Sequence, residues 1–83
     1  MVNIMIVDDH LIVREGIRLI LETEERYEVV GEAENGQQAL DILQTVTPDV
    51  ILLDLNMPIL DGLNLMKKLQ NIGMTVPSII LTT

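Results

Sequence analysis

Short apolar runs alternate with segments of helical periodicity along all 83 residues, and this alternation restricts the possible folds more than any other feature of the sequence. The apolar runs predict four strands, at residues 3–7, 27–33, 49–53 and 78–82. The periodic segments predict three helices, at residues 11–22, at residues 37–44, and from about Asp61 to a stop at Gly73. Strict alternation with short connections favours one α/β domain, a parallel sheet with helices on both faces and right-handed crossovers.

The apolar positions indicate which side of each element faces the core. The run at 50–53 is apolar without interruption, which is typical of a strand buried on both faces of a parallel sheet. The helical stripes comprise Val13, Ile17, Ile20 and Leu21 in the first helix, Ala39, Leu40 and Leu43 in the second, and Leu63, Met66 and Leu69 in the third. We expect Met57 to be a core residue or to cover a loop, and Asn35-Gly36 to mark a turn and nothing more.

Composition excludes several classes of function. Thirteen acidic and five basic residues give a net charge of −8, which argues against a nucleic-acid interface because phosphate contacts need clustered Lys and Arg. The sequence contains no cysteine, so disulfides and thiolate metal sites are excluded. Hydrophobic residues make up 48% of the chain, which fits either a core-rich sheet protein or a piece of a larger fold.

A membrane association is not expected. The longest apolar runs fall far short of the ~20 residues that a membrane-spanning helix needs. The first residues contain neither a basic segment nor a small-residue cleavage site of the kind that marks a secretion signal. By elimination we expect a cytoplasmic protein.

Acidic residues follow two of the predicted strands at the edge where chemistry is expected. Asp8 and Asp9 come directly after the first strand, Asp54 after the third, and Thr82 ends the fourth. In one common strand order, 2-1-3-4-5, the first and third strands are neighbours, and ligands bind beyond the carboxyl ends of the strands. Three carboxylates then share a small volume, where either a pKa rises or a cation lies among them. Oxygen ligands with access to water suit Mg²⁺.

Each acid also has a simpler interpretation. Asp8 and Asp9 could cap the first helix or favour its N-terminal dipole, and Asp54 could cap a turn after its strand. Neither interpretation explains why all three acids fall at the same predicted edge, so together they favour a metal site. His10 follows the acidic pair, and we expect it to be a helix-start residue that modulates the site at most.

Three strings in this sequence resemble the motifs of response-regulator receiver domains: IVDDH at 6–10, LDLNMP at 53–58 and DG at 61–62. The resemblance covers the whole chain and implies a flavodoxin-like, three-layer αβα fold with strand order 2-1-3-4-5 when complete. Residues 13–16 (VREG) and 29–33 (VVGEA) further resemble the subfamily with a LuxR-type helix-turn-helix output domain.

The resemblance implies a role for each matching residue. Asp54 would accept a phosphoryl group from a sensor histidine kinase. Mg²⁺ would be held by the carboxylates of Asp9 and Asp54, by the backbone carbonyl of Asn56, and by Asp8 through a bound water. Thr82 would be the switch hydroxyl that turns toward the phosphoryl oxygens.

Two further residues shape the loop after Asp54. We expect Pro58 to make this loop rigid. We expect Gly62 to permit close packing where the third helix begins.

Residues 1–83 correspond by this resemblance to the N-terminal two-thirds of a receiver domain, ending after the fourth strand. The family's Lys and switch aromatic on a fifth strand are absent, as is the output domain through which a parent protein would bind DNA. Disorder, truncation or completion of the sheet by a second chain could each account for this, and we favour a longer parent. The phosphorylated parent is expected to form a homodimer.

Two other functions remain open at this point. A phosphohydrolase or phosphotransferase also uses an Asp nucleophile with Mg²⁺, but the best-known examples place a general acid two residues later, where this chain has Asn56. A phosphate-independent interaction module is the other alternative, and the set of acids with Thr82 argues against it. We therefore expect a signalling switch rather than a turnover enzyme.

The isolated 83-residue piece is expected to be marginally stable and to self-associate, because the edge of the fourth strand is free to pair. Analytical ultracentrifugation should show oligomers, and thermal melting should show a low, broad transition. A monomer that melts cooperatively would contradict this prediction.

Overall fold

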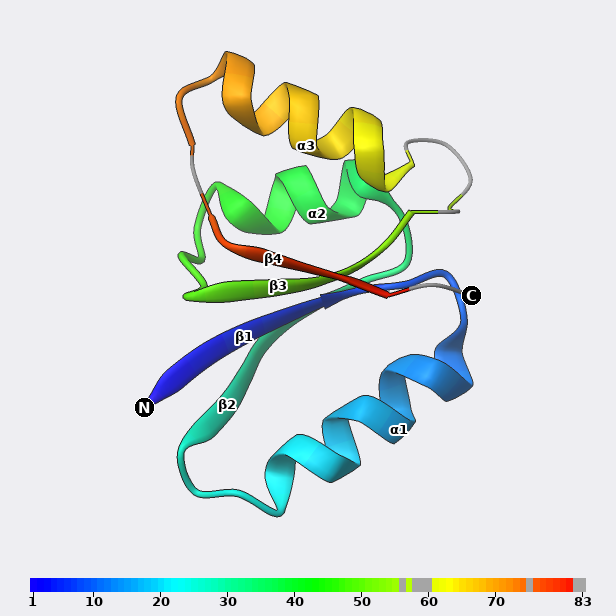
Figure 1. The fold of residues 1–83 in the computed structure, drawn as a ribbon, viewed down its shortest axis with the longest axis vertical. Coiled ribbons are helices and arrows are strands. Elements are labelled where there is room, and N and C mark those ends of the chain that lie inside the picture. Colours follow the sequence, from blue (N-terminus) through cyan, green and yellow to red (C-terminus); the bar gives the residue numbers. More distant parts are fainter. Residues whose placement is uncertain (56, 58–60, 75, 82–83) are drawn as a thin grey trace.

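A computed structural model describes residues 1–55, 57, 61–74 and 76–81 of the chain (Figure 1). Seven elements follow one another in strict alternation, as predicted. They are β1 (Val2–Val7), α1 (Leu11–Glu22), β2 (Tyr27–Ala33), α2 (Gly36–Leu43), β3 (Val50–Asp54), α3 (Gly62–Asn71) and β4 (Ser78–Leu81).

All strand pairs are parallel, and the sheet has the order β2-β1-β3-β4. This is the flavodoxin-like order as far as its fourth strand, so the predicted fold class is confirmed. In the ladder between β1 and β3, Val7 lies opposite Leu53. The start of β3 is tied to β1 as well, because Asp49 Oδ2 accepts a hydrogen bond of 2.7 Å from the backbone N–H of Asn3.

The helices form two outer layers of unequal size. Helices α2 and α3 cover one face of the sheet, and α1 lies against the other (Figure 1). The main hydrophobic core lies between the sheet and the α2–α3 layer. Its buried residues are Met5, Val7, Ala33, Ala39, Leu43, Ile51, Leu53, Met57, Leu65 and Leu69.

The predicted stripe of α3 is partly wrong. Leu63 is 55% exposed, whereas Leu65 is fully buried together with Leu69. Gly62 is the first residue of α3 and lies directly against the backbone of β3. This contact sets the rotation of the helix, so residues three, four and seven positions later face the sheet and Leu63 does not.

The prediction for α1 also needs a correction. Val13, Ile17 and Leu21 are half-buried, but Ile20 is 70% exposed, and no residue of α1 is fully buried. Ile20 lies at the margin of the stripe, next to Gly16, where an added methyl group would meet nothing within 4 Å. Within the described residues, no second helix covers this margin.

The helix ends show two caps and one glycine stop. Asn35 caps α2 by accepting a hydrogen bond of 2.9 Å from the Gln38 N–H, which is a larger role than the turn expected from the sequence. The cap places the first residue of α2 at Gly36, one residue earlier than predicted. Asp61 caps α3 through the Asn64 N–H at 2.8 Å. Gly73 has a φ of 78° and ends α3 as predicted.

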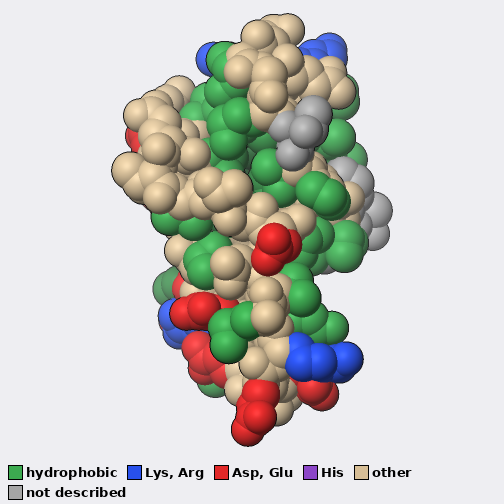
Figure 2. Space-filling model, turned by 90° about the vertical axis from the view of Figure 1, so that its left-hand side faces the viewer, with side chains coloured by type: hydrophobic (Ala, Val, Ile, Leu, Met, Phe, Trp, Pro, Cys, Tyr) green, Lys and Arg blue, Asp and Glu red, His purple; other side chains and the backbone are tan. Residues whose placement is uncertain are grey.

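One face of the molecule shows how the charged side chains are distributed. Figure 2 shows that acidic side chains gather at the α1 and β2 end of the face in view, while Lys and Arg appear as separate spots rather than as a patch. Hydrophobic side chains are exposed on the same face. Among the described residues, no helix is long and apolar enough to cross a bilayer.

Gly62→Ala should destabilise the domain, because the new Cβ would lie 2.6 Å from the Asp54 carbonyl oxygen and 3.0 Å from the Leu55 Cα. Both neighbours are backbone atoms, so we expect a loss of about 1–3 kcal/mol in the free energy of unfolding, measured by urea denaturation.

Gly16→Ala is the matched control, since it lies inside α1 with open space at the Cβ position. It should stabilise the domain by about 0.5–1 kcal/mol, because alanine has less backbone entropy to lose. Equal effects of the two substitutions would contradict the packing argument.

Candidate metal centre

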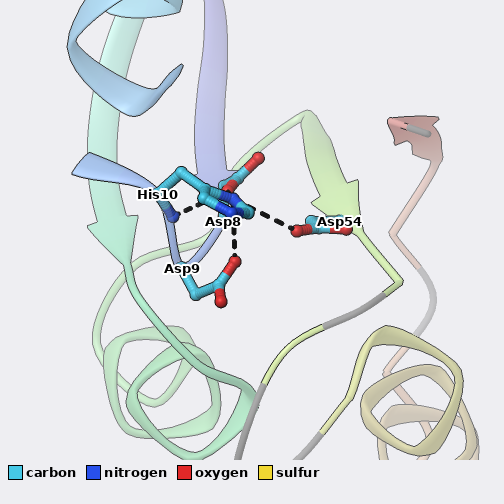
Figure 3. Close-up of side chains that lie close together, drawn as sticks. All are labelled: Asp8, Asp9, His10 and Asp54. Carbon is cyan, nitrogen blue, oxygen red and sulfur yellow. Dashed lines mark hydrogen bonds and ion pairs between the residues drawn. The ribbon is translucent and has the colours of Figure 1, made fainter. Parts of the chain in front are cut away.

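Three acidic side chains meet where β1 and β3 end (Figure 3). Because Val7 pairs with Leu53, the residues that follow them, Asp8 and Asp54, are neighbours across the sheet. Asp9 extends from the turn between β1 and α1 toward the same point. The predicted convergence of these acids at one sheet edge is therefore observed. Asp54 is the last residue of β3 rather than the first residue after it.

The acids differ in their exposure to water. Asp8 and Asp54 are completely buried, whereas 28% of the Asp9 side chain is exposed. A buried carboxylate loses its hydration and needs hydrogen bonds or an opposite charge in exchange. The edge of the site at Asp9 remains open to water.

His10 completes the cluster, although the sequence indicated only a helix-start residue near it. Its ring Nδ1 lies 2.9 Å from Asp8 Oδ1, 3.0 Å from Asp9 Oδ1 and 4.0 Å from Asp54 Oδ2 (Figure 3). His10 is also the N-cap of α1, but its side chain makes no capping hydrogen bond, so the ring is free to turn toward the acids. Its position directly after the acidic pair was the only sequence signal.

The capping interpretation of the acidic pair is not supported. The N-cap of α1 is His10, and neither acid accepts a hydrogen bond from a later residue in the first turn. Asp8 Oδ1 accepts instead a hydrogen bond of 2.8 Å from the His10 backbone N–H. The Asp8 Oδ2 atom is buried and has no hydrogen-bond partner among the described residues.

This arrangement fits a divalent cation. One ligand atom from each of Asp8, Asp9, His10 and Asp54 lies within 4.8 Å of the others. Carboxylate oxygens with access to water are the ligands that Mg²⁺ prefers. The buried Asp8 Oδ2 has no hydrogen-bond partner among the described residues, and a cation or its bound water could take that place. The residues present therefore fit the metal that the sequence led us to expect.

The remaining predicted site residues divide into two groups. Asn56, Pro58 and Thr82 lie outside the described residues. Gly62 is described, and its close approach to the Asp54 carbonyl matches the packing that was expected of it. Met57 is buried in the core next to the site, which decides between the two interpretations of this residue.

The acidic surroundings change the proton affinity of His10. The pKa of its imidazole lies above the ordinary value of 6.5, first because of its hydrogen bond with the Asp8 carboxylate and second because of the charge on Asp9. Desolvation opposes this rise, while the charges of Asp8 and Asp54 add to it. At acidic pH the imidazolium therefore acts as a counterion for the cluster.

The strand order and the acids at the ends of β1 and β3 define the class of receiver-like α/β domains. Comparison with known proteins agrees, because the family model for the response regulator receiver domain matches residues 4–83. This chain belongs to the response regulator receiver family.

Its relatives include transcriptional regulators. The chain is 48% identical over 81 residues to the transcriptional regulatory protein YdfI of Bacillus subtilis (strain 168), covering 98% of this chain and 38% of YdfI. The chain thus spans well under half of that relative.

Solved structures give the same assignment. RcsB from Salmonella enterica serovar Typhimurium, bound to promoter rprA in the presence of the phosphomimetic BeF3−, superposes with a TM-score of 0.87 at 36% identity, covering 99% of this chain and 69% of the chain in that structure. A LuxR-family two-component response regulator from Aurantimonas sp. SI85-9A1 gives 0.89 at 34% identity, covering 99% and 59%. The LuxR-type resemblance is confirmed.

The proton equilibrium of His10 offers a direct test of the cluster. His10 is the only histidine, so its ring signals in a proton NMR titration are unambiguous. We expect a midpoint above pH 6.5 that falls when Mg²⁺ is added, because the cation offsets the charge of the acids.

The same shift has a consequence for stability with a definite sign. A raised pKa in the folded state contributes stability that is fully present below pH 6.5 and is lost as the pH rises through the folded-state value.

Asp9→Asn should lower the midpoint of the His10 NMR titration, because it removes one of the charges that raise the pKa of the ring. A midpoint at or below 6.5 without Mg²⁺ would contradict the geometry of the cluster.

Proposed function

We propose that this receiver domain is a phosphorylation-dependent switch with Asp54 as the phosphoacceptor. The observation that supports this most directly is the meeting of a buried Asp54 with Asp8 and Asp9 at one edge of the sheet. A carboxylate can act as a nucleophile toward phosphorus, and two neighbouring acids are the means to hold a cation beside it.

Mg²⁺ is the cofactor proposed for this site. Asp9 and Asp54 would bind it through their carboxylates, Asn56 through its backbone carbonyl, and Asp8 through a bound water. When bound, the metal neutralises charge on the transferring phosphoryl group and positions it. Pro58 and Gly62 would shape the loop that brings Asn56 to the site.

The transfer itself involves the Asp54 side chain. A carboxylate oxygen of Asp54 forms a bond to phosphorus while the bond from phosphorus to the imidazole nitrogen of a phosphohistidine breaks. The donor histidine leaves and takes up a proton, and Asp54 becomes an acyl phosphate. The donor is proposed to be a sensor histidine kinase in the cytoplasm.

The new phosphate would change the surface of the domain. It adds a charge of about −1.5 to −2 and three strong hydrogen-bond acceptors. Thr82 would turn its hydroxyl toward these oxygens and so relay the change to neighbouring loops. In a longer parent protein, this change would promote homodimer formation. It would act through a DNA-binding output domain, by analogy with the RcsB structure bound to promoter DNA.

A switch is proposed rather than an enzyme with turnover. Asn56 stands two residues after Asp54, where a hydrolase of this chemistry would need a carboxylic acid as a proton donor. An amide cannot donate its proton in that way, so the acyl phosphate would persist long enough to signal.

Phosphorylation should depend on both Asp54 and Mg²⁺. In the full-length parent protein, incubation with a small phosphodonor should add one phosphoryl group in mass spectrometry, and beryllofluoride should give a bound signal in fluoride NMR. Both should require Mg²⁺ and both should disappear in Asp54→Asn.

Asp49→Asn is the matched control, because Asp49 lies at the opposite end of β3 and is exposed. It should be modified like the wild type. Modification that persists in Asp54→Asn would overturn the assignment of the phosphoacceptor.

A further inference from the structure

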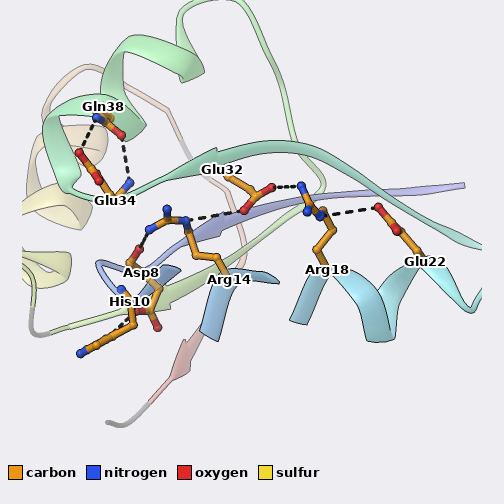
Figure 4. A network of polar contacts seen from close by, with 8 residues as sticks. All are labelled: Asp8, His10, Arg14, Arg18, Glu22, Glu32, Glu34 and Gln38. Carbon is orange, nitrogen blue, oxygen red and sulfur yellow. Dashed lines mark hydrogen bonds and ion pairs between the residues drawn. The ribbon is translucent and has the colours of Figure 1, made fainter. Parts of the chain in front are cut away.

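The side chain of Arg14 connects the acidic site with two neighbouring elements (Figure 4). Arg14 belongs to α1, and its Nη1 donates a hydrogen bond of 2.6 Å to the backbone carbonyl of Asp8. Its Nε lies 3.6 Å from Oε1 of Glu32 on β2. Only 12% of the Arg14 side chain is exposed, so these contacts are sheltered from water and screened less than a surface ion pair.

Glu32 is itself held in place from a second direction. Its Oε2 accepts a hydrogen bond of 3.0 Å from Nη1 of Arg18, one turn further along α1. The two arginines thus share one carboxylate, and only Arg14 reaches on to the acidic site (Figure 4). Arg14 and Glu32 come from the two segments, 13–16 and 29–33, that resemble the LuxR-type subfamily and that the phosphoacceptor chemistry does not use.

The bond to the Asp8 carbonyl has a specific geometric effect. A peptide unit is planar, so the Asp8 carbonyl lies in one plane with the backbone nitrogen and Cα of Asp9. The Asp8 N–H is already fixed by a hydrogen bond of 3.0 Å to the Ala33 carbonyl of β2. Arg14 fixes the peptide on the other side of Asp8, and therefore the point from which the Asp9 side chain extends.

We propose that Arg14, anchored by Glu32, is a positioning residue that orients the Asp8–Asp9 peptide so that both carboxylates face the cation. This inference rests on the proposed function, because it assumes that the acids hold Mg²⁺. Arginine suits the task, since its planar guanidinium holds its N–H donors in a fixed fork that can bind a carboxylate and a carbonyl at once, whereas a lysine offers a single flexible ammonium group.

A purely structural role is the competing explanation, in which the arginines only attach α1 to the sheet. Arg18 provides the matched control. It binds the same Glu32 at a shorter distance than Arg14, and it makes an additional contact of 3.8 Å with Glu22. Unlike Arg14, Arg18 makes no contact with Asp8 in the network that Figure 4 draws. A structural role predicts that both substitutions lower the melting temperature and leave the Mg²⁺ affinity unchanged, whereas a positioning role predicts a loss of Mg²⁺ affinity for Arg14 alone.

The experiment is an NMR titration with Mg²⁺ that follows the backbone amide signals of Asp9 and His10. It is carried out on the wild type and on the variants Arg14→Ala, Arg18→Ala and Glu32→Gln. Substituting a residue that orients metal ligands typically weakens metal affinity about 10–100-fold. We expect Arg14→Ala to raise the Kd for Mg²⁺ about 10-fold, and Glu32→Gln by a smaller factor in the same direction. Arg18→Ala should stay within about twofold of wild type, and Arg14→Lys should restore part of the loss, because it keeps the charge without the fork.

Thermal melting of the same variants separates positioning from folding. Arg14→Ala should melt at a lower temperature than Arg18→Ala, because the Arg14 side chain is 12% exposed and that of Arg18 is 41% exposed. Both variants should remain folded, and only Arg14→Ala should lose Mg²⁺ affinity. An unchanged Kd in Arg14→Ala, or an equal rise in Arg18→Ala, would overturn the proposal. If Arg14→Ala does not fold, Glu32→Gln decides, because it loosens the anchor and leaves Arg14 present.

The outcome also distinguishes this inference from the proposed function. If wild type neither binds Mg²⁺ nor accepts beryllofluoride, the proposed function fails. If wild type does both and Arg14→Ala behaves identically, only the role of Arg14 fails.

Discussion

The parallel pairing of β1 with β3 is the interaction on which the rest of the structure depends. Its register places Val7 opposite Leu53 and thereby brings Asp8 beside Asp54, although the two acids are distant in sequence. Successive side chains of a strand point to opposite faces, so a slip of β3 by one residue would separate the acids and turn Leu53 away from the core that Val7 still faces. Core packing and site geometry are therefore fixed by the same set of hydrogen bonds.

This pairing buries charge, and the surrounding contacts compensate for it. Asp8 and Asp54 have no exposed surface, and a buried carboxylate without partners is costly. Asp8 receives hydrogen bonds from His10, while its carbonyl receives one from Arg14. The result is a turn that α1 holds through Arg14 and β2 through the Ala33 carbonyl, with the open side at Asp9. Such a site buries Asp8 and Asp54 and leaves an opening at Asp9, where the proposed cation and phosphodonor would enter.

Sequence reasoning was correct where local patterns decide the outcome and wrong where neighbours do. The seven elements and the three acids at one edge were predicted, because period and strand ends are local properties. Leu63 was placed in the core instead of Leu65, because the rotation of α3 depends on Gly62 lying against β3. Ile20 was expected to be covered, but it lies at a margin that no described element reaches. Asn35 was predicted to mark only a turn, although it caps α2, because a cap and a turn have the same sequence signature.

The sequence alone determined the order of strands and helices along the chain, the number and spacing of the carboxylates, and the scarcity of basic residues, since these follow from residue type and spacing. Only the tertiary structure decided that Asp8 and Asp54 are buried as neighbours, that the His10 ring turns into the acids, and that Arg14 reaches the Asp8 carbonyl. The physical reason is that each of these depends on strand register and on the rotation of a helix against the sheet. Those quantities are set by contacts between distant segments, and no local pattern encodes them.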